Sequence, residues 1–296
     1  MDQSALPIVI NRSGGTATAL GEGLGQAVEK AFAQAGLPVA LHLVDGSALS
    51  QTLAGLAGSP VVAVGGGDGT LGHAAGLLAA AGQAMAILPL GTRNHLARQL
   101  AIPDDLEGAA RVIAAGRRQR IDLARAGDRI FVNNASLGLY ARLVRDREAV
   151  VARAHAPKWL ANIPAAWHVL AHLRSHPLDL EIDGERHLIA TPLLFIGNNR
   201  YLLSAGEVGT RDSLSDGELS FYAVAARTPL QLLAMALRTL IGRGDPARDF
   251  AALTTGRRAT LRGRPHLDVA CDGEVARMAL PLDLEIMPGA LEVVVP

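Results

Sequence analysis

The chain has 296 residues, enough for two domains, and its 28 basic and 28 acidic residues give a formal net charge of zero. This balance argues against a protein that binds nucleic acid through a broad basic surface. The single cysteine, Cys271, excludes an internal disulfide and a zinc site built from cysteines. We find no signal-peptide or membrane-span pattern, and therefore expect a cytoplasmic protein.

Short apolar strands alternate with helices through the first 115 residues. The pattern predicts strands at 7–11, 39–44, 61–64 and 84–88, and helices at 19–35, 47–57, 71–81, 95–100 and 104–115. Such alternation is typical of an α/β layer with a mainly parallel sheet. We assign residues 1–122 to this α/β domain.

The pattern changes near Ile121, after which short strands are separated by turns such as Asp183-Gly184. Residues 123–280 are therefore predicted to form a β-sandwich domain, interrupted by helical insertions at 142–175 and 228–241. The strands are expected at 121–126, 129–134, 178–182, 186–195, 218–224, 258–262 and 267–272. Two last strands, 282–286 and 291–295, are expected to return to the first domain.

One stretch, residues 61–70, combines an apolar strand with a turn of glycines, an acid and a hydroxyl. Glycines permit a close backbone approach, and a helix start offers free N–H groups that suit phosphate. Because Asp68 would repel a phosphate unless a cation lay between them, the turn indicates a nucleotide with Mg²⁺. The alternative is a turn that only lets a strand meet a helix.

Three polar segments follow strand ends: Asn11, Gly65 to Thr70, and Gly91 to Asn94. In parallel sheets ligands bind beyond the carboxyl ends of the strands, so these segments should converge on one edge. The glycine turn has neither the Gly-Lys-Ser/Thr of a Walker A loop nor the spacing of a dinucleotide-binding fingerprint.

Together the segments 11–15, 66–70 and 89–94, with the later pairs 215–219 and 272–274, resemble the diacylglycerol kinase family. The resemblance is to its bacterial branch, which has a phosphofructokinase-like nucleotide fold. It covers almost the whole chain. The Gly-Gly-Asp-Gly-Thr motif alone is shared with NAD kinases, whereas the segments 89–94 and 272–274 favour the lipid kinases.

This resemblance implies a role for each matching residue. Glu274 would be the general base for the acceptor hydroxyl, and Asp68 would orient Mg²⁺–ATP at the catalytic centre. A structural Mg²⁺ would be held by Asp216 with Ser213 and Glu218. The residues implied to contact ATP are Asn11, Gly65, Gly66, Gly67, Asp68, Gly69, Thr70, Leu71, Thr92 and Asn94.

The segment 89–94 departs from the family's pattern, because Arg93 and His95 flank Asn94 where a small residue and an acid are common. His95 supplies no carboxylate for the Mg²⁺-linked contact that the family's acid implies at this position. Without the resemblance, Asp216-Gly217 and Asp272-Gly273 are ordinary hairpin turns.

We therefore interpret the chain as a lipid kinase that transfers the ATP γ-phosphoryl group to a hydroxyl of a membrane lipid, with diacylglycerol as the first expectation. Sphingoid bases, ceramide and phosphatidylglycerol stay open, as do an NAD kinase and a nucleotide-binding regulatory protein without turnover. Arginines and tryptophans within 142–170 suit peripheral membrane contact, or equally a solvated helix. A homodimer is a further expectation.

Overall fold

The computed structural model describes residues 5–13, 15–138, 176–201, 211–224 and 249–296, with isolated positions between 228 and 238. The chain divides into two compact units, residues 1–123 with 288–296, and residues 124–287. The predicted helical insertion at 142–175 lies outside the described residues, and most of the one at 228–241 does too.

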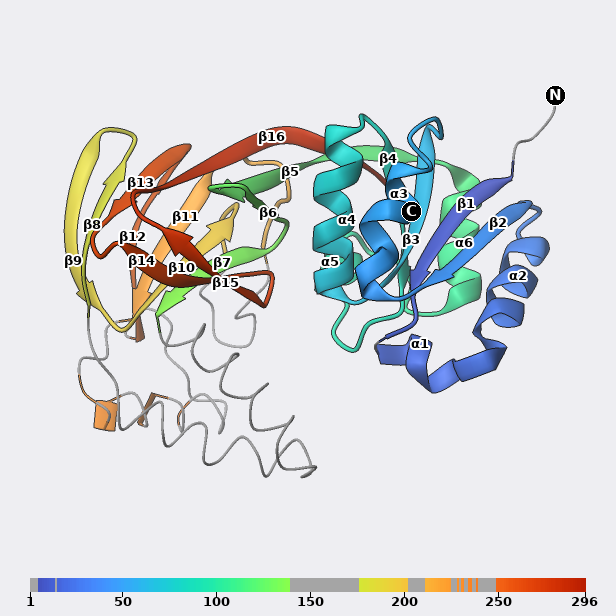
Figure 1. The fold of residues 1–296 in the computed structure, drawn as a ribbon, viewed down its shortest axis with the longest axis horizontal. Helices are drawn as coiled ribbons and strands as arrows, with labels where there is room; N and C mark the ends of the chain where they lie inside the picture. The colour runs from blue at the N-terminus through green and yellow to red at the C-terminus, as the bar shows by residue number, and fades with distance from the viewer. Residues whose placement is uncertain are drawn as a thin grey trace. The chain divides into compact units, whose positions relative to one another are not determined.

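The first unit is built on a parallel sheet in the order β2-β1-β3-β4, joined at β4 by the end of β16 (Leu282–Val294) (Figure 1). The strands are rich in Val, Ile, Leu and Ala, and three of them are almost wholly buried, as expected of a parallel sheet covered on both faces. They are β1 (Leu6–Asn11), β2 (Val39–Val44), β3 (Val61–Gly66) and β4 (Ala84–Pro89).

Helices of this unit pack in two pairs, α3 with α4 and α2 with α6. In Figure 1, α4 lies in front of the sheet and α6 behind it. The predicted helix 19–35 is broken at Gly21, whose φ of 52° is left-handed. The helices are α1 (Gly15–Leu20), α2 (Leu24–Gln34), α3 (Leu49–Ala54), α4 (Asp68–Ala80), α5 (His95–Gln99) and α6 (Leu106–Ala115), with single 3₁₀ turns η1 (Gly21–Gly23) and η2 (Gly46–Ala48).

The second unit is an antiparallel β-sandwich, as predicted. One sheet has six strands in the order β12-β11-β10-β7-β14-β15, and the opposing strands run β16-β13-β8-β9, with β5 paired to β16 and β6. The strands are β5 (Arg118–Ala126), β6 (Arg129–Phe131), β7 (Asn134–Gly138), β8 (His176–Ile182), β9 (Glu185–Thr191), β10 (Leu193–Asn198), β11 (Leu219–Val224), β12 (Phe250–Gly256), β13 (Arg258–Arg262), β14 (His266–Cys271), β15 (Glu274–Ala279) and β16 (Leu282–Val294).

Apolar side chains from both sets of strands form the core of this unit. Fully buried members include Phe131, Leu180, Leu194, Phe221 and Leu261. Because successive side chains on a strand point to opposite faces, each strand contributes alternate residues to this core.

Several predicted strands were wrong in extent. The predicted strand 186–195 is two strands, β9 and β10, which belong to different sheets. Pro192 separates them, because proline has no N–H for a ladder hydrogen bond. The predicted strand 129–134 likewise divides into β6 and β7, whereas 282–286 and 291–295 are one continuous strand, β16. Strands β12 and β15 were not predicted.

Candidate active site

The glycine turn joins β3 to α4. Gly67 is the N-cap of α4, and the helix begins at Asp68, three residues earlier than predicted. The first N–H groups of a helix have no partner within it, and the positive end of the helix dipole lies beside them. Asp68 is half-buried, and its Oδ1 accepts a long hydrogen bond of 3.4 Å from the Leu96 N–H at the start of α5.

Asn11 at the end of β1 is tied to the first turn of α4. Its Nδ2 donates to the Thr70 hydroxyl at 3.0 Å, and its Oδ1 accepts from the Ser13 N–H at 3.0 Å. The next residue, Arg12, forms an exposed ion pair with Asp45 at 3.2 Å.

Asn94 shapes the turn after β4. It is buried in the left-handed region with φ of 50°, where its Oδ1 accepts from the Gly91 N–H at 2.9 Å and its Nδ2 donates to the Pro89 carbonyl at 3.1 Å. Thr92, Arg93 and His95 on the same turn are exposed. The Asn94 Nδ2 also donates to Asp104 Oδ1 at 3.3 Å, so this side chain ties the loop to the start of the next segment, while its neighbours face solvent.

Three of the glycines are required by packing inside the protein. A Cβ on Gly91 would lie 2.5 Å from the Gly67 Cα, one on Gly66 would lie 2.6 Å from the Thr70 Cβ, and one on Gly65 would lie 2.8 Å from an Ile10 carbon. The three strand-end segments therefore converge: Gly67 and Gly91 are in close backbone contact, and Asn11 reaches the glycine turn through its side-chain bond to Thr70. Close packing alone explains these three glycines.

In the second unit, Glu274 follows a two-residue turn between β14 and β15. Asp272 and Gly273 have φ of 47° and 89°, as a tight hairpin turn with two left-handed residues requires. The Glu274 side chain is 60% exposed, with one oxygen 3.8 Å from Arg129. The base that the resemblance implies is thus an exposed side chain next to a tight hairpin turn.

Asp272 is bound more tightly than a turn residue needs to be. Its carboxylate accepts from the backbone N–H groups of Val132 at 2.7 Å, Asn133 at 2.8 Å and Asn134 at 3.1 Å. Loss of hydration raises the pKa of Asp272 to about 6, against the lowering effect of these donors and of Arg211. The sequence showed only the turn, and not this anchor.

This pKa predicts a pH dependence of stability. Because the folded-state pKa of Asp272 exceeds the ordinary value of 3.8, the folded state binds the proton more tightly than the unfolded chain. The contribution of Asp272 to the free energy of unfolding is therefore greatest below about pH 4 and declines as pH rises through about 6. Urea titrations at several pH values give the free energy of unfolding of wild type and of Asp272→Asn. As pH rises from about 4 to above about 6, the free energy of wild type should decline relative to that of the variant. A constant difference between the two proteins across this range would contradict the prediction.

The three residues implied to hold a structural metal lie in one loop, Arg211 to Glu218. Ser213 Oγ accepts from the Ser215 N–H at 3.0 Å, Asp216 is exposed, and Glu218 pairs with Arg200 at 3.2 Å. Within the described ranges, no three Asp, Glu, His or Cys side chains gather as a metal cluster. A cation here would need hydroxyl or backbone oxygens in addition to the carboxylates.

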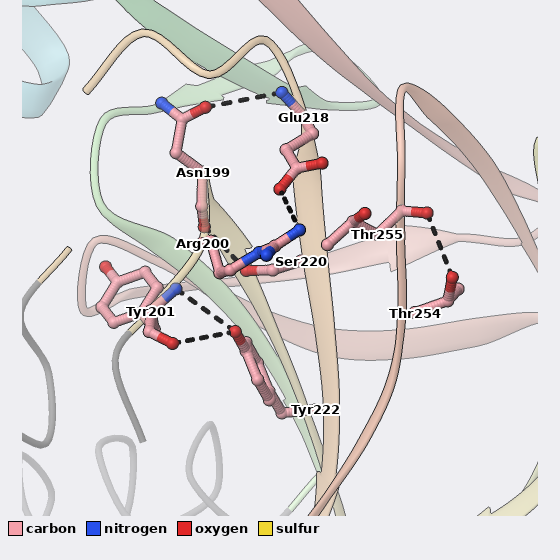
Figure 2. A network of polar contacts seen from close by, with 8 residues as sticks. All are labelled: Asn199, Arg200, Tyr201, Glu218, Ser220, Tyr222, Thr254 and Thr255. Carbon is pink, nitrogen blue, oxygen red and sulfur yellow. Dashed lines mark hydrogen bonds and ion pairs between the residues drawn. The ribbon is translucent and has the colours of Figure 1, made fainter. Parts of the chain in front are cut away.

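Polar contacts also fix the strands beside this loop (Figure 2). The Glu218 N–H donates to Asn199 Oδ1 at 3.4 Å, and Ser220 Oγ donates to the Asn199 carbonyl at 2.7 Å. The Tyr222 hydroxyl accepts from the Tyr201 N–H and donates to the Tyr201 carbonyl. These contacts fix the Glu218 end of the loop, and an isolated β-bridge between Tyr201 and Arg211 holds its start.

Two family profiles together cover nearly the whole chain. The diacylglycerol kinase catalytic domain matches residues 5–126, and the YegS C-terminal NAD kinase beta sandwich-like domain matches residues 135–295. The first profile falls on the α/β unit of the fold and the second on the β-sandwich and the C-terminal strand. The chain belongs to the family that combines a diacylglycerol kinase catalytic domain with a YegS C-terminal domain, and the second profile alone matches more than half of the chain.

Individual relatives agree with this placement. A probable YegS-like lipid kinase of Cronobacter sakazakii is 32% identical over 170 residues, which is 55% of each chain, so the match spans about half that relative's length. A diacylglycerol kinase of Mycobacterium tuberculosis is 28% identical over 81% of this chain and 78% of its own. A diacylglycerol kinase structure from Bacillus anthracis has a TM-score of 0.68 at 19% identity, covering 100% of this chain and 98% of that one, and shows the same fold.

Proposed function

We propose that the chain is an ATP-dependent lipid kinase, which transfers the γ-phosphoryl group of Mg²⁺–ATP to a hydroxyl of a membrane lipid, with diacylglycerol as the first acceptor to test. The family supports a phosphotransferase. The observation that best supports nucleotide binding is the glycine at position 67, which neither the packing nor the backbone conformation requires.

Nothing in the fold requires a glycine at position 67. Its φ and ψ of −85° and 179° suit any residue, and a Cβ there would meet only the Gly91 Cα at an ordinary 3.5 Å. It is also the N-cap of α4, where a Ser, Thr, Asp or Asn would serve the helix at least as well. A backbone left bare at a helix N-terminus suits the close approach of a phosphate.

This argument predicts opposite effects for two glycines that face each other. Gly67→Ala should change stability by less than about 1 kcal/mol, yet weaken Mg²⁺–ATP binding at least about tenfold, because the methyl group would occupy the place of a phosphate oxygen. Gly91→Ala should instead destabilise the fold by about 1–3 kcal/mol through its clash with Gly67. Calorimetric titration and urea unfolding of both variants test this, and unchanged ATP affinity in Gly67→Ala would remove the argument.

The chemistry assigned to the remaining residues follows from their types. Phosphoryl transfer needs positioning and charge neutralisation more than covalent catalysis. Bound Mg²⁺ would supply that neutralisation, with Asp68 holding the cation at the start of α4. Glu274 would accept the proton of the acceptor hydroxyl. Asn11, Gly65 to Leu71 and Thr92 would surround the nucleotide, with Asn94 setting the shape of the turn that carries Thr92.

A cavity in the second unit supports an acceptor site near Glu274. It has a volume of about 580 Å³, and its lining includes Arg129, Arg277, Met278 and Leu282. Arg129 is also the ion-pair partner of Glu274. The lining also includes the acids Asp128, Asp283 and Glu285, so the cavity combines charges of both signs with apolar side chains. We propose that the acceptor lipid places its polar end there, beside the base.

We propose that Ser213, Asp216 and Glu218 would hold a structural Mg²⁺. Oxygen donors of this kind suit a hard cation. Glu218 would have to exchange Arg200 for the metal.

Membrane contact belongs to the same proposal. Residues 142–158 lie outside the described residues, but Arg257, Arg258, Arg262 and Arg264 are exposed along and beside β13. Among the helices that the structure describes, none combines the length and the apolar character needed to cross a bilayer. Contact through basic side chains at an anionic lipid surface would bring the enzyme to its substrate. Cytoplasmic location and a homodimer stay predictions.

An NAD kinase is the second candidate, since the sandwich matches an NAD kinase-like profile and the central motif is shared with that class. We expect no NADP when the protein is incubated with Mg²⁺–ATP and NAD and the product is read by an NADP-specific dehydrogenase. NADP formed at a rate comparable with lipid phosphorylation would favour the second candidate.

A further inference from the structure

The backbone segment Val132–Asn134 connects the Glu274 turn to a buried arginine. On one side its N–H groups donate to the Asp272 carboxylate, and the Asp272 N–H returns a bond to the Asn134 carbonyl at 2.9 Å. On its other side the Arg211 guanidinium donates through Nη1 to the Val132 carbonyl at 2.7 Å and through Nη2 to Asn133 Oδ1 at 3.0 Å. All of these groups lie within the second unit.

The bonds on the two sides are joined through single peptide groups. The Val132 carbonyl, which accepts from Arg211, shares its peptide group with the Asn133 N–H, which donates to Asp272. The Asn133 carbonyl accepts from the Tyr201 hydroxyl at 3.0 Å and shares its peptide group with the Asn134 N–H. A donor on the carbonyl polarises the peptide, and chains of this kind strengthen each bond by about 10–30%.

Arg211 is buried, with 7% of its surface exposed, and its Cζ lies 5.6 Å from the centre of the Tyr201 ring. Burying a guanidinium costs desolvation free energy, which is offset only if the group forms hydrogen bonds of good geometry. Its charge also favours the ionised form of Asp272. The other titratable or charged groups around this turn are Tyr201, Cys271, Arg129, Asp128 and Glu274.

We propose that Arg211 is a positioning residue for Glu274, acting through the Val132–Asn134 backbone and the Asp272 carboxylate. This inference rests on the proposed role of Glu274 as the general base. Since Arg211 also opens the loop that ends at Glu218, the base and the proposed metal loop share one anchor.

The test is a double-mutant cycle with Glu274→Gln. Arg211→Met removes the charge and the donors, and Arg211→Lys keeps the charge but loses the planar fork. Arg186→Met is the matched control, because it removes a bidentate arginine from the exposed Asp179 pair on the hairpin of β8 and β9. Each variant is assayed with labelled ATP and dioleoylglycerol in mixed micelles, beside calorimetric Mg²⁺–ATP affinity.

We expect Arg211→Met to lower kcat by about 10- to 100-fold, since a misplaced catalytic group can cost about 10², with Mg²⁺–ATP affinity changed less than about twofold. Arg211→Lys should lose less than Arg211→Met, and Arg186→Met should match wild type. In the Glu274→Gln background, neither Arg211 substitution should lower kcat further.

An equal loss of kcat in both backgrounds would overturn the coupling while leaving Glu274 as the base. Full turnover by Glu274→Gln alone would instead remove the base and, with it, this inference. Should Arg211→Met fail to fold, the same cycle with Arg211→Lys decides between coupling and independence.

Discussion

Asp68→Asn is expected to lower kcat on the order of 10³-fold or more, as expected when a preorganised charge at the reacting phosphate is lost. Asparagine keeps the size of the side chain and can still accept the 3.4 Å bond from the Leu96 N–H. It removes the negative charge that would hold Mg²⁺ at the start of α4. The fold should therefore persist while metal-dependent turnover disappears.

The matched control is Asp105→Asn at the start of α6. Asp105 is also an acid at a helix N-terminus, and it caps the helix by accepting from the Gly108 N–H at 2.7 Å. Asparagine caps almost equally well, so this variant should keep its activity. Wild-type turnover and Mg²⁺ dependence in Asp68→Asn would show that the acid serves only the turn.

Glu274→Gln should lower kcat by about 10²–10⁴, the usual contribution of one positioned base. Glutamine preserves shape and hydrogen bonding but cannot take the hydroxyl proton. Since a base acts in the transition state, Mg²⁺–ATP affinity should not change. The melting temperature should change little, because the lost ion pair with Arg129 is exposed and worth less than about 1 kcal/mol.

Nucleotide affinity and kcat must be measured on the same preparation of this variant. Turnover within a few-fold of wild type would mean that the base lies elsewhere, and the assignment of the 272–274 turn should then be dropped.

The sequence predicted the fold class because the signals are local. Strand and helix periodicity, with glycine and proline between the elements, marks the α/β unit, and hairpin turns such as Asp183-Gly184 mark the sandwich. The division between β9 and β10 was missed because residues 186–195 are almost continuously strand-like. Only the pairing of each half with a different sheet shows that Pro192 is a boundary.

The site could be predicted as a set of segments but not as a set of contacts. The convergence of the segments could be predicted, because Asn11, Asp68 and Asn94 lie at or just after strand ends. The bonds of Asn94 to Gly91 and Pro89 were not, since a loop asparagine can face either a ligand or its own backbone. Arg211 carries no signal at all in the sequence, because its partners lie at residues 132, 133 and 198.

The central claim is tested most directly by following γ-labelled phosphate from ATP into lipid. Mixed micelles carrying diacylglycerol, ceramide, a sphingoid base or phosphatidylglycerol would be incubated with wild type and with Asp68→Asn, and the organic phase counted over time. We predict label in a phosphorylated lipid, strongest with diacylglycerol, that requires Mg²⁺ and is lost in Asp68→Asn. Label confined to the aqueous phase with every lipid, although Mg²⁺–ATP binds, would contradict a lipid kinase.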